Sequence, residues 1–295
     1  MRSMFRGVTT AMVTPFTSSG AIDFDSYGRL IEDQIRRGVR ALVPCGSTGE
    51  AATLSHDEHI EIFRFVVRQV NRRVPVLAGT GSNNTAEAIH LSRAAQDAGA
   101  DAVLIIAPYY NKPTQAGLLN HFRMIADAIS IPMMLYDIPG RTQVKIETAT
   151  TVALAQHPRI RGMKDATGSL DNTSRLRRAT PQDFGVFSGD DSLTLPMLAV
   201  GADGVISVAS HLIPEALNAM LSAFQNGEVA RARDLHLEYL DLMHGIFVET
   251  NPAPIKYCLM RCGLIAIDTM RPPLAPLLPE SRAKLDALLV QYKLI

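Results

Sequence analysis

Lys164 is the residue of this chain that is best placed for covalent chemistry. It ends a short strand-like run, residues 160–164, just before a Gly-containing turn at residues 165–168. If that strand lines a barrel, the amine is desolvated, and desolvation lowers the pKa of a lysine. A neutral lysine amine attacks carbonyl groups. From this segment alone, a solvent-facing lysine remains the alternative. The other lysines have polar, charged or helical surroundings: Lys112, Lys145, Lys256, Lys284 and Lys293.

A second segment offers groups that bind anions. Residues 46–50 read Gly-Ser-Thr-Gly-Glu, and they follow another strand-like run. The hydroxyls of Ser47 and Thr48, with adjacent backbone N–H groups, suit a carboxylate. A plain turn, in which Ser or Thr caps the following helix, is the alternative. The segment is not a P-loop, because it lacks the Gly-Lys-Ser/Thr ending.

Three tyrosines and an arginine follow two further strand-like runs. Tyr109 and Tyr110 follow one run, whereas Tyr136 and Arg141 belong to the next. Tyrosines at strand ends can simply pack with a wet hydroxyl, but three near one lysine suggest proton transfer. Arg141 follows a Pro-Gly turn and offers a planar fork for a carboxylate. A surface ion pair is the alternative for Arg141.

The sequence does not predict a metal site. Asp190 and Asp191 resemble metal ligands, but no His or Glu lies near them in the sequence, so helix capping is favoured. His56 and His59 lie one helical turn apart without an evident third ligand. The three cysteines form no zinc or disulfide framework.

Composition indicates an ordinary globular chain and excludes two classes of partner. The 295 residues are 47% hydrophobic and 20% charged, and Lys plus Arg equal Asp plus Glu at 29 each. Proteins that bind nucleic acids or membrane surfaces usually carry an excess of basic residues, and this chain has none. The first residues do not read as a signal peptide, and no apolar run approaches the roughly 20 residues that span a bilayer. We expect a cytoplasmic protein.

Strand-like and helical segments alternate along the chain. Helical periodicity is clear at residues 24–37, 56–70 and 85–98. Alternation of this kind predicts a parallel sheet, and eight evenly spaced strands predict a (β/α)₈ TIM barrel rather than a doubly wound sheet. The eight predicted strand runs are residues 7–15, 41–46, 74–79, 102–108, 132–138, 160–164, 184–189 and 204–209.

The chain continues beyond what a barrel needs. We expect the barrel to occupy residues 1–225 and a C-terminal helical extension to occupy residues 226–295. The predicted late helices are residues 214–224, 229–247, 254–262 and 280–292. In a barrel of this kind, the carboxyl ends of the strands and the loops after them form the active site. The fold therefore predicts that Lys164 and the groups described above converge.

Five motifs together resemble the dihydrodipicolinate synthase / N-acetylneuraminate lyase family of pyruvate-dependent class I aldolases. The similarity runs nearly end to end, from residues 7–11 to residues 251–256. No single motif is decisive, but five in this order and spacing are highly specific. They are residues 46–50, 109–113, 136–142, 162–165 and 204–208.

The resemblance implies a mechanism. Lys164 would form a Schiff base with pyruvate, and the derived enamine would attack the aldehyde of L-aspartate 4-semialdehyde. Ring closure by the substrate amine would give 4-hydroxy-tetrahydrodipicolinate, an intermediate of diaminopimelate and lysine biosynthesis. Tyr136 matches the family's proton-transfer tyrosine, with Ser47 and Tyr110 as relay partners; in the family, the latter comes from a neighbouring subunit. No cofactor is implied, because the iminium is itself the electron sink.

The resemblance also implies how the substrates bind. The amides of Ser47 and Thr48 would hold the pyruvate carboxylate, and the Ile206 carbonyl would border the pyruvate site. Arg141 would receive the carboxylate of the semialdehyde. A sibling aldolase acting on N-acetylmannosamine or a sugar-acid fragment is the alternative, although Arg141 favours a short acidic aldehyde.

A non-catalytic barrel that binds pyruvate-like ligands is an alternative of another class. The joint presence of Lys164, Tyr136, Ser47 and Tyr110 argues against it. Two residues depart from the family pattern. Ser47 stands where the synthases usually have threonine, so its rotamer is less restricted, and serine there also resembles the sibling lyases. Asp137 replaces a common asparagine and adds negative charge near Arg141.

A regulatory site and an assembly are further implications of the resemblance. Lysine-inhibited members bind L-lysine at a tight dimer interface, and members assemble as homotetramers, each a dimer of dimers. Ala51 departs from the usual serine there, and solvated helix faces are the alternative. The matching positions are Ala52, His56, His59, Asn83, Glu87 and Tyr109.

Overall fold

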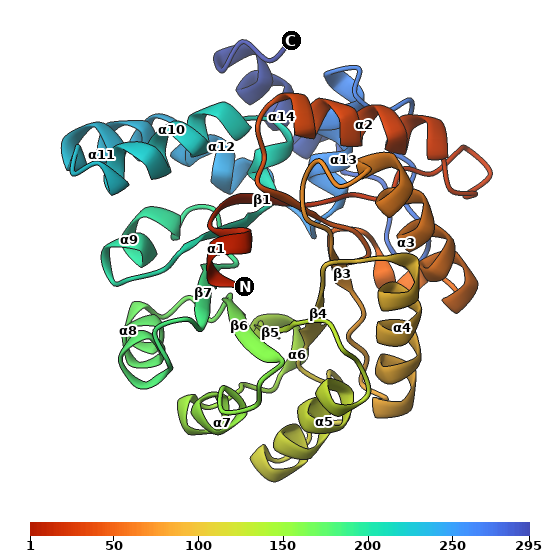
Figure 1. Cartoon of the computed structure of the whole chain (residues 1–295). Helices are drawn as coiled ribbons and strands as arrows, with labels where there is room; N and C mark the ends of the chain where they lie inside the picture. The colour runs from red at the N-terminus through yellow and green to blue at the C-terminus, as the bar shows by residue number, and fades with distance from the viewer.

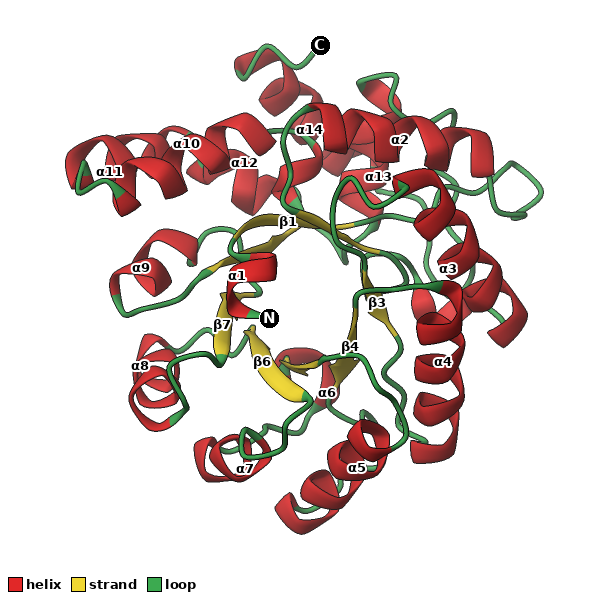
Figure 2. Cartoon of the chain, viewed as in Figure 1, coloured by secondary structure: helices red, strands yellow, loops and turns green.

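Eight parallel strands form a barrel surrounded by helices (Figures 1 and 2). The structure, a computed structural model, describes residues 1–295. Bonded neighbours follow the order β2-β1-β8-β7-β6-β5-β4-β3, and a bridge between Leu42 and Val76 joins the two ends of this series. The predicted TIM barrel is confirmed. The strands are β1 (Gly7–Ala11), β2 (Ala41–Val43), β3 (Leu77–Gly79), β4 (Ala102–Ile106), β5 (Met133–Asp137), β6 (Ile160–Asp165), β7 (Gly185–Ser188) and β8 (Gly204–Ser207).

Helices cover the outside of the barrel, and the three predicted from periodicity are confirmed as α2, α3 and α4. A reciprocal capping box between Ser55 and Glu58 begins α3. None of the helices is long and apolar enough to cross a bilayer. The α-helices up to the eighth barrel unit are α1 (Arg2–Phe5), α2 (Phe24–Arg36), α3 (His56–Val70), α4 (Thr85–Ala98), α5 (Gln115–Asp127), α6 (Pro139–Thr142), α7 (Thr148–Leu154), α8 (Leu170–Ala179), α9 (Thr194–Ala199) and α10 (Pro214–Gln225).

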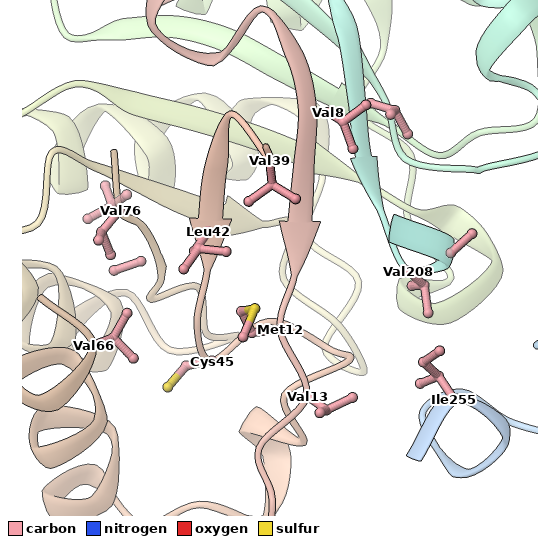
Figure 3. Close-up of a cluster of buried hydrophobic side chains, with 14 of the residues drawn as sticks. Val8, Met12, Val13, Val39, Leu42, Cys45, Val66, Val76, Val208 and Ile255 are labelled. Carbon is pink, nitrogen blue, oxygen red and sulfur yellow. The ribbon is translucent and has the colours of Figure 1, made fainter. Parts of the chain in front are cut away.

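Buried side chains form two cores, one on each face of the strands, because successive strand residues point to opposite faces. The larger core lies between strands and helices and includes Val8 and Leu42, drawn in Figure 3. The smaller core fills the barrel and includes Phe187 and Ile206. The short helix α1, which the sequence analysis did not predict, adds Phe5 to this inner core. Figure 1 shows α1 over the centre of the barrel.

The C-terminal extension differs from the prediction at one point. The single helix predicted over residues 229–247 is wrong, because the chain breaks at Tyr239 into two helices. The Tyr239 ring stacks on Tyr292, with ring centroids 5.3 Å apart. The Tyr292 hydroxyl donates to the Glu238 carbonyl at 2.8 Å. These long-range contacts stabilise the interruption between the two helices. The extension contains α11 (Val229–Glu238), α12 (Leu240–Gly245), α13 (Ala253–Arg261) and α14 (Pro279–Gln291).

Asp137 is a buried carboxylate with too few hydrogen bonds to offset its loss of water. It ends β5 and has no exposed surface. The backbone N–H of Ile146 donates to Oδ1 at 3.2 Å, whereas Oδ2 has no partner. Burial raises the pKa of Asp137 to about 7, against the hydrogen bond from Ile146, and the charge of Asp165 opposite it on β6 raises it further. The folded protein therefore holds a proton that the unfolded chain loses at lower pH.

Because Asp137 holds this proton only when folded, we expect the Asp137→Asn variant to be more stable than the wild type at high pH. Because the folded pKa lies above the ordinary value of 3.8, stability from this carboxyl falls as pH rises from about 4 to about 7. The variant removes the buried charge, so we expect the free energy of unfolding to rise by about 1–3 kcal/mol near pH 8 and little near pH 4. Denaturant titrations at both pH values measure this. An equal change at both would contradict the assignment.

Candidate active site

The amine of Lys164 lies in a dry part of the barrel. Its register partners are Tyr136 on β5 and Phe187 on β7. The side chain is only 6% exposed, and Nζ lies 4.3 Å from the centroid of the Tyr136 ring. Burial lowers the pKa of Lys164 to about 8; the charge of Asp191 opposes this fall and that of Arg141 adds to it. About one amine in ten is therefore neutral at pH 7, against about one in a few thousand for a free lysine.

Tyr136 lies between the lysine and the loop after β2. Burial raises the pKa of its phenol to about 12, although the charge of Arg141 and a hydrogen bond with the Ser47 hydroxyl both lower it. The phenol thus stays protonated at neutral pH and can both donate and accept a hydrogen bond. The structure brings together Lys164, Tyr136 and Ser47, as the sequence predicted.

The loop after β2 leaves two backbone donors unused. The N–H groups of Gly49 and Glu50 bond back to Gly46 and Ser47, whereas those of Ser47 and Thr48 reach no backbone carbonyl. Free adjacent N–H groups form an anion site. The neighbouring strand must pass close by: a Cβ on Gly79 would lie 2.3 Å from the carbonyl oxygen of Cys45, so only glycine fits there.

Arg141 is available for an anion. It lies on α6, directly after β5, and its Nη2 donates to the Asn251 carbonyl at 3.1 Å. No carboxylate lies within ion-pair distance of it, so the alternative of a surface ion pair is wrong. The guanidinium lines a cavity of about 340 Å³ that Ser47 and Tyr136 also line. Lys164 is not part of the cavity wall, and Ile206 belongs, like Tyr136, to the inner core of the barrel.

Tyr110 is not part of this constellation within one chain. Its side chain is 89% exposed, and its backbone is left-handed, with φ of 71°. It does not line the cavity that Tyr136 lines. A relay through Tyr110 therefore requires a site on another copy of the chain.

The predicted regulatory residues form a connected cluster. His56 Nε2 and Ser82 Oγ bond to the two oxygens of Glu87, each at 2.8 Å. Asn83 Nδ2 donates to the Tyr109 carbonyl at 3.1 Å. The exposed-face alternative is wrong for His59, which is only 6% exposed. Four of the predicted residues line the same cavity as Ser47: Ala52, His59, Glu87 and Tyr109.

Asp191 has a role that sequence reasoning missed. The expected capping of the next helix is wrong, because α9 has no side-chain cap. Asp191 is instead buried and accepts from the backbone N–H groups of Val208 and Ala209 at 3.0 and 2.9 Å and from the Ser207 hydroxyl. It thereby joins the loops after β7 and β8 and supplies the negative charge that acts on Lys164. No group of three or more His, Cys, Asp or Glu side chains could hold a metal.

Asn251 is a second residue whose role was missed. Its Nδ2 donates to Thr48 Oγ1 at 3.0 Å, and its carbonyl accepts from Arg141. It therefore links the two predicted carboxylate-binding groups. One signal for Asn251 was present in the sequence, since residues 251–256 end the resemblance to the family. Which atoms it would contact could not be read from that segment.

Comparison with known proteins agrees with this geometry. The model of the Dihydrodipicolinate synthetase family matches residues 4–292. The 4-hydroxy-tetrahydrodipicolinate synthase of Geobacter sulfurreducens is 49% identical over 99% of this chain and 100% of its own. Two crystal structures, each 40% identical, cover 99% of this chain. They are the Cyanidioschyzon merolae enzyme with lysine bound (TM-score 0.97, 99% of that chain) and the chloride-inhibited dihydrodipicolinate synthase of Acinetobacter baumannii complexed with pyruvate (TM-score 0.96, 100%). This chain belongs to the dihydrodipicolinate synthase family.

Proposed function

We propose that this protein is a 4-hydroxy-tetrahydrodipicolinate synthase, a lyase that condenses pyruvate with L-aspartate 4-semialdehyde. The observation that carries the proposal is the buried Lys164 amine, which lies 4.3 Å from the Tyr136 ring at the carboxyl end of the barrel. The relatives described above bear this enzyme's name and are matched over their full length. They favour the synthase over a sugar aldolase.

The first step forms a bond between Lys164 and pyruvate. The neutral amine attacks the ketone carbon, the carbonyl oxygen leaves as water, and a protonated imine remains. The proton that leaves the amine and those that the oxygen gains pass through the Tyr136 phenol. Its high pKa keeps that phenol protonated between transfers. The free N–H groups of Ser47 and Thr48 hold the pyruvate carboxylate during these steps.

The second step joins the two substrates. Loss of a methyl proton turns the imine into an enamine, whose carbon attacks the semialdehyde aldehyde. The substrate amine then attacks the imine carbon, closes the ring and expels Lys164 as a free amine. Arg141, which has no carboxylate partner of its own, receives the carboxylate of the semialdehyde. The Ile206 carbonyl borders the pyruvate.

Assembly completes the site in this proposal. Tyr110 is 89% exposed on its own chain, so its hydroxyl can join Tyr136 and Ser47 only in a neighbouring copy. A homotetramer made of two tight dimers supplies that copy. We likewise propose a cytoplasmic location, where the free thiols of Cys45, Cys258 and Cys262 stay reduced.

Reductive trapping tests the role of Lys164. With pyruvate and borohydride, we expect an adduct on Lys164 and none on the other buried lysine, Lys256. Because the pKa lies near 8, the trapping rate of the free enzyme should rise about tenfold per pH unit below that value and level off above it. Peptide mapping and rates across pH measure this, with Lys164→Ala as the blank. An adduct elsewhere, or a pH-independent rate, would contradict the assignment.

Parallel assays test the substrate. We expect pyruvate consumption with L-aspartate 4-semialdehyde and none with N-acetylmannosamine. Arg141→Ala should raise KM for the semialdehyde by about 10- to 100-fold with little change for pyruvate, because it removes a charged bidentate contact. Arg233→Ala, which removes an exposed arginine of α11, is the matched control. Turnover with N-acetylmannosamine alone would contradict the synthase assignment and identify the protein as a sibling aldolase.

L-Lysine is the proposed inhibitor of the cluster around Glu87. Burial would raise the pKa of Glu87, but the hydrogen bonds from His56 and Ser82 outweigh it, so the pKa lies below its usual value. The charged carboxylate suits an ammonium group. A relative from Cyanidioschyzon merolae is known with lysine bound.

Inhibition assays test this site. We expect millimolar L-lysine to slow turnover and Glu87→Gln to raise the inhibitory concentration about tenfold or more at nearly unchanged kcat, because it removes a charge-assisted contact. Glu147→Gln, which alters an acid that does not line the cavity, is the control. A rate that millimolar lysine leaves unchanged would remove the regulatory proposal.

A further inference from the structure

A fully buried ion pair lies outside the chemistry described so far. Lys256 on α13 and Glu50 on the loop after β2 both have side chains without exposed surface. Lys256 Nζ donates to Glu50 Oε1 and to the Thr269 carbonyl, each at 2.6 Å. Taking two charges out of water is costly, and a buried pair is weak evidence of a stabilising role. The pair therefore calls for a functional explanation.

Glu50 ends the loop that offers its N–H groups to pyruvate. Its backbone is left-handed, with φ of 54°, a conformation that is uncommon for residues other than glycine. Its second oxygen, Oε2, accepts from the backbone N–H of Arg271 at 3.1 Å. Both oxygens of Glu50 are thus held by the C-terminal extension, two residues away from Thr48.

The same part of the extension contacts the loop at two further points. Asn251 Nδ2 donates to Thr48 Oγ1 at 3.0 Å, and Arg271 Nη1 donates to the Thr53 carbonyl at 3.0 Å. Arg271 is itself fixed by two bonds to Glu58, at 2.8 and 2.6 Å. Residues 251–271 therefore form hydrogen bonds with the loop before, at and after Glu50.

The pair also controls charge at the cavity. Glu50 lines the same cavity as Ser47 and Arg141. An unpaired Glu50 carboxylate buried behind this cavity would repel the carboxylate of an incoming substrate, since like charges act strongly on each other where water is excluded. Lys256 supplies the cancelling positive charge; its side chain has no exposed surface, and its Nζ lies 4.3 Å from the Phe16 ring centroid.

We propose that Lys256 and Glu50 are positioning residues through which the C-terminal extension sets the loop that binds the pyruvate carboxylate. The inference rests on the proposed function, because pyruvate is the ligand of that loop. Neither residue reacts. Their pairing aims the N–H groups of Ser47 and Thr48 and keeps the cavity free of an unbalanced negative charge.

Pyruvate affinity is the quantity that tests the pair. We expect Lys256→Met to raise KM for pyruvate about 10- to 100-fold, because a small misplacement of a binding group costs that much. KM for the semialdehyde should change far less. The borohydride trapping rate at low pyruvate should fall in parallel, and that readout needs no second substrate. Lys256→Arg, which keeps the charge, should recover part of the loss.

Two more variants separate positioning from folding. Glu50→Gln/Lys256→Met removes both charges and so leaves no uncompensated one; Glu50→Gln alone keeps the side-chain length and an acceptor. Both should fold and still bind pyruvate weakly. Arg2→Met breaks a pair with Asp203 that involves α1 rather than the loop after β2, and it should lower Tm without changing KM for pyruvate.

The outcomes are distinguishable. Folded Glu50→Gln or double variants with wild-type KM and trapping rate would overturn the inference and leave the pair a structural one. Weak pyruvate binding in Arg2→Met as well would also overturn it, since any loss of stability would then suffice. A wild-type enzyme that traps pyruvate but does not consume the semialdehyde would refute the proposed substrate without touching the inference.

Discussion

Exclusion of water from the inside of the barrel is the constraint on which the rest of the site depends. An amine in water near neutral pH is almost entirely protonated and cannot attack a carbonyl. The parallel register of β5, β6 and β7 places Lys164 between Tyr136 and Phe187, and these side chains replace water around it. The same closure raises the pKa of the Tyr136 phenol, so one physical cause prepares both groups.

The two charged groups that act on the Lys164 amine, Asp191 and Arg141, are hydrogen-bonded to backbone groups and form no ion pair with the amine. Asp191 is bound by three donors from β8 and the turn after it, so its charge is fixed. It moderates the fall in the Lys164 pKa, whereas Arg141 deepens it. A positively charged imine gains from the same Asp191 carboxylate, since a fixed negative charge in a dry site needs no reorganisation as positive charge develops.

The barrel could be predicted because its signals are local. Each strand run ends in turn residues, and each early helix has its own periodicity, so β1 to β8 and α2 to α4 lie where expected. The break at Tyr239 could not be predicted, because the contact that holds it comes from Tyr292, over fifty positions later in the chain. The convergence of Lys164, Tyr136 and Ser47 followed from the fold alone, since carboxyl ends of barrel strands share one face.

The two buried lysines show where local reasoning ends. Burial lowers the pKa of both Lys164 and Lys256, but only Lys256 has a carboxylate in contact, at 2.6 Å. The Glu50 carboxylate favours the protonated form of the Lys256 amine. A protonated amine has no free lone pair, so Lys256 cannot attack a carbonyl. Its partner Glu50 lies 206 positions away, a distance that no sequence pattern spans. Burial is therefore necessary for a reactive lysine in this chain but not sufficient, because the buried amine must also be left without a carboxylate partner.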